Sequence, residues 1–482
     1  GGGAMAGEAA LEGLLGLAAR HSHLVLEAVL LLVIAHLLTR KSYRPKTEAP
    51  LTKDEIEQLC EEWQPEPFVP PGPPPGGPAP DLVVESRMGA RATVNGVDCL
   101  NLASANYLGL QGDARILAAC RETVDKYGCG SCGPRGFYGT IDVHLDLEKE
   151  AAAFLGTEEA ILYSYDVALA SSVIPAFCKP GDTIVADGAV GFGIQSGITL
   201  SRSKARYFAH NDCEALERVL LELQREEEHA GSRVTRRKAP TGRKFIVVEG
   251  LYGNCGDVAP LPRVHTLARK FKYRLIVEES HSLGVLGATG RGVSEHFGME
   301  PRSMDIILAS LGNAFASVGG ICFGSKVICD HQRLNGAAYV FSASLPPFLS
   351  TAAHEAFRTL GLEPRLTAAL ASNVAALREE LSSIDGVDVV GAPESPLVHL
   401  LVRPGPGIPR GGHELQALYC KVAERAAREG VLVDVPRYSP LERQPIPPSI
   451  RVFASAGHDA QDLCAAARTL GESFREVLSV PG

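Results

Sequence analysis

The residues of this chain that are best suited to take part in a reaction lie in short loops that follow apolar runs. Glu278 and His281 follow one such run, and Asn313 lies in a loop of small residues that follows another. A lysine in a loop of this kind can form a Schiff base with a carbonyl group. No lysine occurs between Lys272 and Lys326, so the loop that contains Asn313 has no amine for that reaction.

The glycine-rich segment 128–133 contains two motifs that carry chemistry in other settings. Its sequence, GCGSCG, matches the G-x-G-x-x-G dinucleotide fingerprint and includes the pair Cys129-x-x-Cys132. Both motifs require a strand before them, whereas the stretch 114–127 has the pattern of an amphipathic helix. We therefore interpret these glycines as backbone that turns tightly beside a ligand or another chain.

The elements that must position these residues alternate from about residue 90 onward. The expected strands are 160–163, 183–186, 245–249, 274–278, 306–309 and 320–323, and the expected helices include 114–127 and 212–228. Strands that are buried on both faces and separated by helices predict an α/β fold with a mostly parallel sheet. After Pro347, a long helical region and the segments 397–402, 431–435 and 449–454 predict a smaller α+β domain.

The composition excludes several classes of protein. The chain has 482 residues, of which 45% are hydrophobic, so it can bury a large core. The 56 acidic residues outnumber the 47 lysines and arginines, and we expect no nucleic-acid partner. The 12 cysteines lack the dense spacing of a disulfide scaffold, so we expect reduced thiols, and we predict no metal site.

The N-terminal region has its own organisation. Residues 24–38 form the most apolar run of the chain, and four basic residues follow within 40–46. We expect one transmembrane helix over residues 8–39, with the body facing the cytosol by the positive-inside rule. An amphipathic helix docked on the protein or in the membrane interface is the alternative. Residues 40–89 are expected to form a juxtamembrane segment and a stiff, proline-rich tether.

Four segments in a fixed order resemble one family. They are residues 101–110, residues 130–148, residues 277–292, and residues 308–324 with Tyr339–Pro347. Together they resemble the α-oxoamine synthases, pyridoxal phosphate (PLP) enzymes of the aspartate-aminotransferase fold type. The resemblance runs from about residue 90 to the C-terminus and implies a PLP-transferase-like large domain over residues 90–347 and a small domain over residues 348–482.

A narrower resemblance comes from the N-terminal apolar run, EEWQPEP at 61–67, and CGPRGFYGTIDVHLDLE at 132–148. These segments are similar to the first long-chain-base subunits of serine palmitoyltransferases. The resemblance implies condensation of L-serine with palmitoyl-CoA to 3-ketodihydrosphingosine, the first step of sphingolipid biosynthesis. It also implies a second long-chain-base subunit that holds PLP covalently, a small activating subunit, ORM-type regulators, and contact with membrane lipid at the endoplasmic reticulum.

The chain departs from the family at three positions that hold the cofactor. Asn313 stands where the family has its Schiff-base lysine, and an amide cannot form the imine. Glu278 stands where the family has the aspartate that binds the pyridinium nitrogen. Gly191 stands where the family has a histidine stacked on the ring. The resemblance therefore implies a chain without catalytic residues of its own.

Two further positions match the family, and a third departs from it. His281 and Arg451 match positions near the cofactor and the substrate carboxylate, and we interpret both as structural or interface residues. Asp166 replaces a family glycine in a turn, where we expect an aspartate to be strained.

Active sites of this family lie between two subunits, so a chain without the lysine can still donate loops to its partner. We expect Ser342 and Ser344 to donate hydroxyl groups toward the PLP of the partner, or else to be interface packing. We expect the turn at 132–138 to lie at the interface, with contacts from Cys132, Gly133, Pro134, Arg135, Phe137 and Tyr138.

Two other functions remain open from the sequence. One is an active homodimeric α-oxoamine synthase that uses a displaced lysine, such as Lys326 or Lys272. The other is a membrane scaffold that regulates a pathway without completing any active site.

Overall fold

The computed structural model of the protein describes residues 22–39, 51–65, 67–68, 82–233, 242–437, 439, 441–443 and 447–479. The chain divides into two compact units, residues 1–72 and residues 73–482. The first unit contains the helices α2 (Ser22–Thr39) and α3 (Lys53–Glu62). Thr52 caps α3 in a capping box with Glu55, which explains why the helix begins there.

Helix α2 covers only part of the predicted transmembrane segment. Its apolar side chains are exposed, for example Leu32 at 70% and Leu38 at 81%. Among the described residues, no helix combines the length and the apolar character needed to span a membrane. The 18 residues of α2 reach about 27 Å, short of the roughly 30 Å of bilayer hydrocarbon. The predicted span over 8–39 is thus not supported, and residues 8–21 lie outside the described residues.

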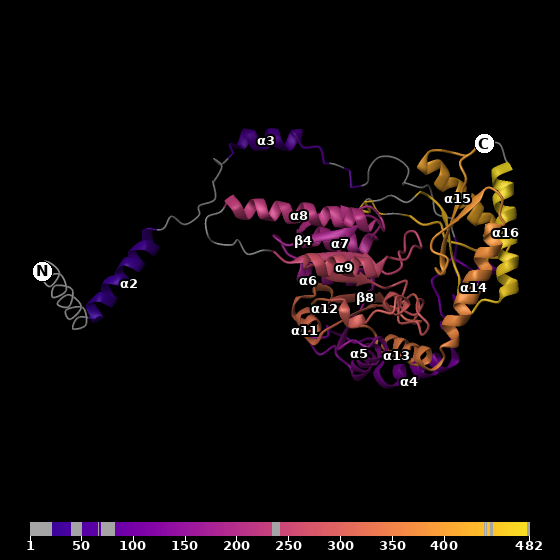
Figure 1. The fold of residues 1–482 in the computed structure, drawn as a ribbon, viewed down its shortest axis with the longest axis horizontal. Helices are drawn as coiled ribbons and strands as arrows, with labels where there is room; N and C mark the ends of the chain where they lie inside the picture. Colours follow the sequence, from indigo (N-terminus) through magenta and orange to yellow (C-terminus); the bar gives the residue numbers. More distant parts are fainter. Residues whose placement is uncertain are drawn as a thin grey trace, which may run out of the picture. The chain divides into compact units, whose positions relative to one another are not determined.

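A seven-stranded sheet forms the centre of the second unit (Figure 1). Its strands lie in the order β3-β9-β8-β7-β6-β4-β5, and β9 is the one strand of this sheet that runs opposite to the other six. The bounds are β3 Glu159–Tyr163, β4 Thr183–Asp187, β5 Lys204–Phe208, β6 Lys244–Glu249, β7 Arg274–Glu278, β8 Ile306–Ser310 and β9 Gly320–Gly324. The predicted α/β fold with a mostly parallel sheet is confirmed.

Helices cover both faces of this sheet because successive strand residues point to opposite sides. The side chains of β6 show this, because they belong alternately to two hydrophobic cores. Phe245 and Val247 pack in the core on one face of the sheet, and Ile246 and Val248 pack in the core on the other face. The first group is α6 (Val167–Phe177), α7 (Phe192–Ser201), α11 (Lys326–Asn335) and α12 (Ala337–Val340). The second is α4 (Ala114–Tyr127), α5 (Asp142–Leu155), α8 (Cys213–Arg233), α9 (Leu261–Phe271), α10 (Val293–His296) and α13 (Pro347–Leu362).

Two three-stranded sheets and three long helices complete the unit. One sheet joins β1 (Arg91–Val94), β2 (Val97–Asn101) and β12 (Val431–Leu432), and the other joins β10 (Val387–Val390), β11 (Leu397–Val402) and β13 (Ile450–Phe453). The helices are α14 (Arg365–Ser382), α15 (Gly412–Arg428) and α16 (Ala460–Ser479), and a 3-10 turn covers Pro301–Ser303. Figure 1 shows α14, α15 and α16 together on one side of the body.

Candidate functional site

The carboxyl ends of the central parallel strands meet at one edge of the large sheet. Strands β4, β6, β7 and β8 end at Asp187, Glu249, Glu278 and Ser310. In open α/β sheets this is the edge at which ligands bind. A cavity of about 310 Å³ lies there, lined by Asp166, Gly191, Glu249, Gly253, Asn254, Glu278, Ser280, His281, Ser310, Asn313 and Arg451, among others. The fold therefore brings together Gly191, Glu278, His281, Asn313 and Arg451, which sequence reasoning had selected separately.

Asn313 is held in place by both of its amide groups. The Nδ2 group of its side chain donates a hydrogen bond of 2.8 Å to the backbone carbonyl of Ser280. The backbone carbonyl of Asn313 accepts the backbone N–H of Tyr107 at 3.1 Å. Among the residues that the structure describes, no lysine lines the cavity. This arrangement fixes the loop after β8 without supplying an amine.

Two carboxyl groups share the floor of the cavity. Glu278 and Glu249 are paired residues on the neighbouring strands β7 and β6. Burial, and then the charge of Glu249, raise the pKa of Glu278 to about 8. Burial raises the pKa of Glu249 to about 7, although its two oxygens accept the N–H groups of Gly191 at 2.6 Å and Gly253 at 3.0 Å. Burial thus favours the protonated form of both groups.

Sequence reasoning missed Glu249. The signal was present, because the segments ending β6 and β7 both finish in glutamate, and adjacent parallel strands place equivalent ends side by side. Glu249 also limits the space for a side chain at position 191, since a Cβ added at Gly191 would lie 3.4 Å from a carboxyl oxygen of Glu249. A carboxyl group thus occupies the space next to the position at which the family has an aromatic ring.

His281 is a neutral, fixed imidazole. Burial, and then the charge of Arg451, lower the pKa of His281 to about 3. Its Nδ1 lies 2.8 Å from the hydroxyl of Tyr107, which is fully buried. This contact holds the ring in one orientation at the cavity wall.

Arg451 is already paired within the chain. Its guanidinium contacts the carboxylate of Asp434 at 2.7 and 2.9 Å, and its Nη1 donates to the carbonyl of Gly253 at 3.3 Å. A substrate carboxylate would have to compete with Asp434 for this side chain.

Asp166 is not strained, and that prediction is wrong. Its backbone has φ −68° and ψ −42°, an ordinary helical conformation at the start of α6. The side chain accepts the N–H of Val167 at 2.7 Å and the hydroxyl of Ser310 at 2.7 Å. Aspartate is a preferred residue at this position because it satisfies an N–H group that the helix leaves unpaired.

The turn at 132–138 is tied to the body of the chain at two points. The hydroxyl of Ser344 lies 2.7 Å from the carbonyl oxygen of Gly133 and 2.5 Å from that of Gly139. Arg135 is buried and forms a two-pronged ion pair with Glu148, at 2.8 and 3.0 Å. Ser344 and Arg135 therefore hold the turn from inside, and their polar groups already have partners within this chain.

The outer side of the same turn is apolar and exposed. Phe137 is 63% exposed, Tyr138 is fully exposed, and Phe341, next to Ser342, is 84% exposed. Cys132 is also exposed and has a positive φ of 58°. Exposed aromatic side chains on two segments that are hydrogen-bonded to each other form the kind of surface that protein partners cover.

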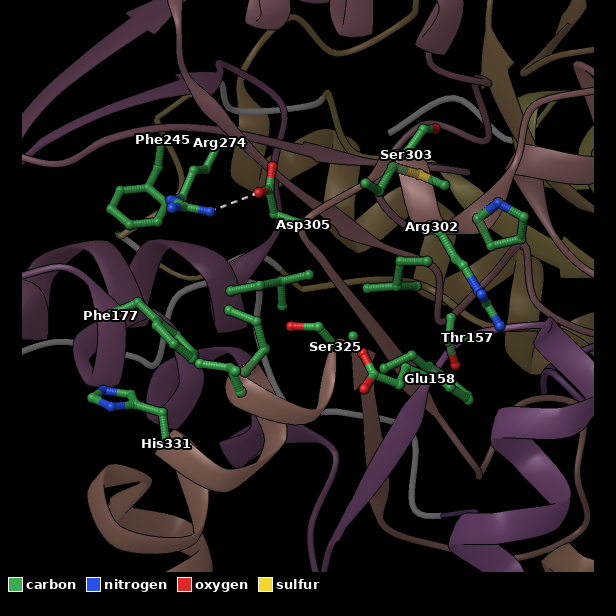
Figure 2. Close-up of a pocket in the computed structure, with 18 of the residues that line it drawn as sticks. Thr157, Glu158, Phe177, Phe245, Arg274, Arg302, Ser303, Asp305, Ser325 and His331 are labelled. Carbon is green, nitrogen blue, oxygen red and sulfur yellow. Dashed lines mark hydrogen bonds and ion pairs between the residues drawn. The ribbon is translucent and has the colours of Figure 1, made fainter.

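A second, larger cavity lies at the opposite edge of the sheet. It has a volume of about 680 Å³ and is lined by residues at the amino ends of β6, β7 and β8. Figure 2 shows Arg274 in this cavity, paired with Asp305 at 2.9 Å. None of the site residues predicted from the sequence lines it, so size alone does not identify the functional site here.

Comparisons with known proteins agree with this geometry. The family of class I and II aminotransferases matches residues 97–470. The chain is 46% identical over 442 residues to long chain base biosynthesis protein 1c of Oryza sativa subsp. japonica, covering 92% of this chain and 89% of that one. It is 41% identical to serine palmitoyltransferase 1 of Dictyostelium discoideum, covering 90% of each chain.

Solved structures show the same fold. A serine palmitoyltransferase from Sphingomonas wittichii superposes with a TM-score of 0.72 at 24% identity, covering 89% of this chain and 97% of that one. An 8-amino-7-oxononanoate synthase from Francisella tularensis superposes with a TM-score of 0.60 at 21% identity, covering 78% and 98%. The chain belongs to the class I and II aminotransferase family and, within it, to the group formed by long chain base biosynthesis protein 1 and serine palmitoyltransferase 1.

Proposed function

We propose that this chain is the non-catalytic subunit of a serine palmitoyltransferase. It pairs with a second long-chain-base subunit that bears the lysine, and the pair condenses L-serine with palmitoyl-CoA to 3-ketodihydrosphingosine. One observation carries the proposal: the cavity at the carboxyl edge of the sheet contains the amide of Asn313, and no lysine of the described part of the chain lines it.

The other residues of the cavity do not fit covalently held PLP either. Glu278 stands where the family has an aspartate beside the pyridinium nitrogen, and a second carboxyl group, that of the buried Glu249, is its neighbour on the adjacent strand. Gly191 offers no ring to stack on the cofactor, and its N–H is already bonded to Glu249. We therefore assign PLP to the partner subunit and derive no chemical step from this chain.

The geometry weighs against an active homodimer with a displaced lysine. Lys326 lies at the start of α11, where it pairs with Glu159 at 3.2 Å and Asp330 at 3.1 Å. Lys272 follows the end of α9. Neither lysine lines the cavity that contains Asn313.

The contribution of this chain in the proposal is the turn at 132–138 with Ser342. The turn is rigid at its base, through Ser344 and Arg135, and exposes Cys132, Phe137 and Tyr138. The hydroxyl of Ser342 lies 3.3 Å from the carbonyl of Ala343, a contact long enough to exchange for a partner's phosphate oxygen. A scaffold that completes no active site would not need these groups, and substitution at Cys132 separates the two functions.

We also propose that the chain acts at the endoplasmic reticulum membrane, with its body facing the cytosol and with small activating and ORM-type subunits as neighbours. The support is the exposed apolar surface of α2 and the basic residues at 40–46. Deletion of residues 5–46, followed by membrane fractionation without partners, tests this part. A full-length chain that is absent from the membrane fraction refutes it, whereas a truncated chain that stays there shows that the chain has a second membrane contact.

Borohydride reduction of the co-purified complex tests the central proposal. We expect the reduced pyridoxyl adduct on a lysine of the partner subunit, found by peptide mass spectrometry, and a colourless isolated chain without activity. Lys272→Ala and Lys326→Ala serve as matched controls that leave turnover unchanged. An adduct on this chain, in stoichiometric amount, refutes the proposal.

A further inference from the structure

Three metal-ligating side chains converge near the site but outside its cavity. His210 follows β5, whereas Cys255 and Asp257 lie in the loop between β6 and α9. Their ligand atoms, one from each side chain, all lie within 4.8 Å of one another. Strand β4 runs between β5 and β6 and ends at Asp187, so the fold places a buried carboxylate directly behind the three groups.

Asp187 orients the imidazole of His210. Its Oδ1 lies 2.9 Å from Nδ1 of His210, and its two oxygens also accept the N–H groups of Ala189 and Asn211, each at 2.8 Å. A carboxylate with these contacts fixes Nδ1 as the donor, so Nε2 points away from Asp187. Histidines that bind metals in proteins are held in this way, with the second nitrogen bonded to a carboxylate.

The distances around Nε2 of His210 match two edges of a tetrahedral zinc site and also lie within hydrogen-bonding reach. Nε2 lies 3.5 Å from Sγ of Cys255 and 3.3 Å from Oδ2 of Asp257. One N–H cannot point at both acceptors, and 3.3 Å exceeds the usual N–H···O length. Bonds of about 2.0 Å to nitrogen and oxygen and about 2.3 Å to sulfur give tetrahedral edges of about 3.5 Å between nitrogen and sulfur and about 3.3 Å between nitrogen and oxygen.

We propose that His210, Cys255 and Asp257 bind a zinc-type divalent cation through Nε2, Sγ and a carboxylate oxygen. The fourth position is open to water, since the side chains of His210 and Asp257 are 16% and 38% exposed. One thiolate and one carboxylate neutralise the two charges of the ion. Binding displaces the protons of the thiol and of Nε2, which pass to solvent.

The ion would brace one wall of the candidate site. Gly253 and Asn254 belong to the same loop as Cys255, and both line the cavity. Gly253 also bonds to Glu249 and Arg451 through its N–H and carbonyl. Coordination would tie this loop to the segment after β5, independently of which subunit holds PLP.

Metal analysis of the full-length chain, purified without chelator together with any subunits that accompany it, tests the proposal. We expect about one zinc per chain, and visible absorption with a sulfur-to-cobalt charge-transfer band after exchange with Co²⁺. Cys255→Ser should lose the charge-transfer band, whereas the control Cys213→Ser should keep it, because Cys213 lies outside the cluster. A chelator should lower the Tm of the wild type but not that of Cys255→Ser.

A second variant covers the case in which Cys255→Ser fails to fold. Asp257→Asn keeps the thiol and should weaken Zn²⁺ binding by more than the about 10–100-fold that loss of an outer carboxylate partner costs. Equal metal content and equal Co²⁺ spectra in the wild type and the variant overturn the proposal. So does a wild-type chain that binds neither Zn²⁺ nor Co²⁺ more tightly than the Asp257→Asn chain.

Discussion

The buried ion pair between Arg135 and Glu148 gives the sharpest test of how the turn at 132–138 is held. Both side chains are nearly inaccessible, with exposures of 5% and 8%. Removing one member of such a pair leaves an uncompensated charge and costs about 3–5 kcal/mol. Arg135→Met should fall at the upper end of this range, because Glu148 then keeps only the N–H of Leu162.

Glu148→Gln should fall at the lower end. Arg135 keeps its bond to the hydroxyl of Thr140 at 3.0 Å, and the amide oxygen of the glutamine can still accept from the guanidinium. The double variant removes both charges, so it should cost only about 1–2 kcal/mol for the lost hydrogen bonds. The sum of the two single costs, about 8 kcal/mol, should therefore exceed the cost of the double variant by about 6 kcal/mol.

Urea unfolding of the full-length chain, followed by far-UV circular dichroism, measures these differences. The exposed pair of Arg403 and Asp388 is a matched control, because it has a similar length of 2.7 Å but both side chains are 55% exposed. Its removal should cost about 0–1 kcal/mol. The reasoning fails if Arg135→Met costs no more than the control, or if the two single variants add up to the double variant.

Three further predictions concern the site and its surroundings. Asn313→Lys should form no competent second site, because Glu278 and Gly191 still lack the cofactor contacts; doubled turnover per heterodimer would contradict this. Burial raises the pKa of Glu279 to about 7, so this group alone should cost the chain about 3 kcal/mol of stability as pH rises from about 4.5 to above 7. Glu279→Gln should lower the slope in urea unfolding at several pH values by that share, while Glu249 and Glu278 keep theirs; an unchanged slope argues against it. Cys132→Trp should change the stability of the isolated chain by about 0.5 kcal/mol or less, but it should lower partner-dependent turnover or the selectivity of that turnover for serine over alanine. The control Cys132→Ala should have only a mild effect on turnover. A normal rate and a normal selectivity with Cys132→Trp would show that the turn is not part of the shared site.

Strands with continuous apolar runs were predictable from the sequence. The predicted strand 274–278 and helix 114–127 coincide with β7 and α4, and most other strands agree to within one residue. Strand β5 was missed because it lies at the edge of the sheet. Its sequence, KARYF, alternates between exposed and half-buried residues and so lacks an apolar run.

The sequence predicted several of the residues that form the candidate site, but it did not predict how Glu249 changes the electrostatics there. Family motifs selected Asn313, Glu278 and Gly191, and the fold places all three on one cavity. The role of Glu249 depends on β6 lying beside β7, and the order of the strands in the sheet was not predicted from the sequence. The bonds of Ser344 to the turn join residues more than 200 positions apart, a separation that no local pattern reports. The division between large and small domains at residue 347 stays a prediction.

The tie between Ser344 and Gly133 also sets an order of events during synthesis. The two residues are 211 positions apart in the chain, and strand β3 likewise waits for β9 before it has a neighbour in the sheet. At ribosomal rates of about 5–20 residues per second, the turn stays without its anchor for some 10–40 s after it emerges. A nascent chain is therefore unable to present the finished turn to a partner until most of its body exists, and early encounters on the ribosome engage an unanchored loop.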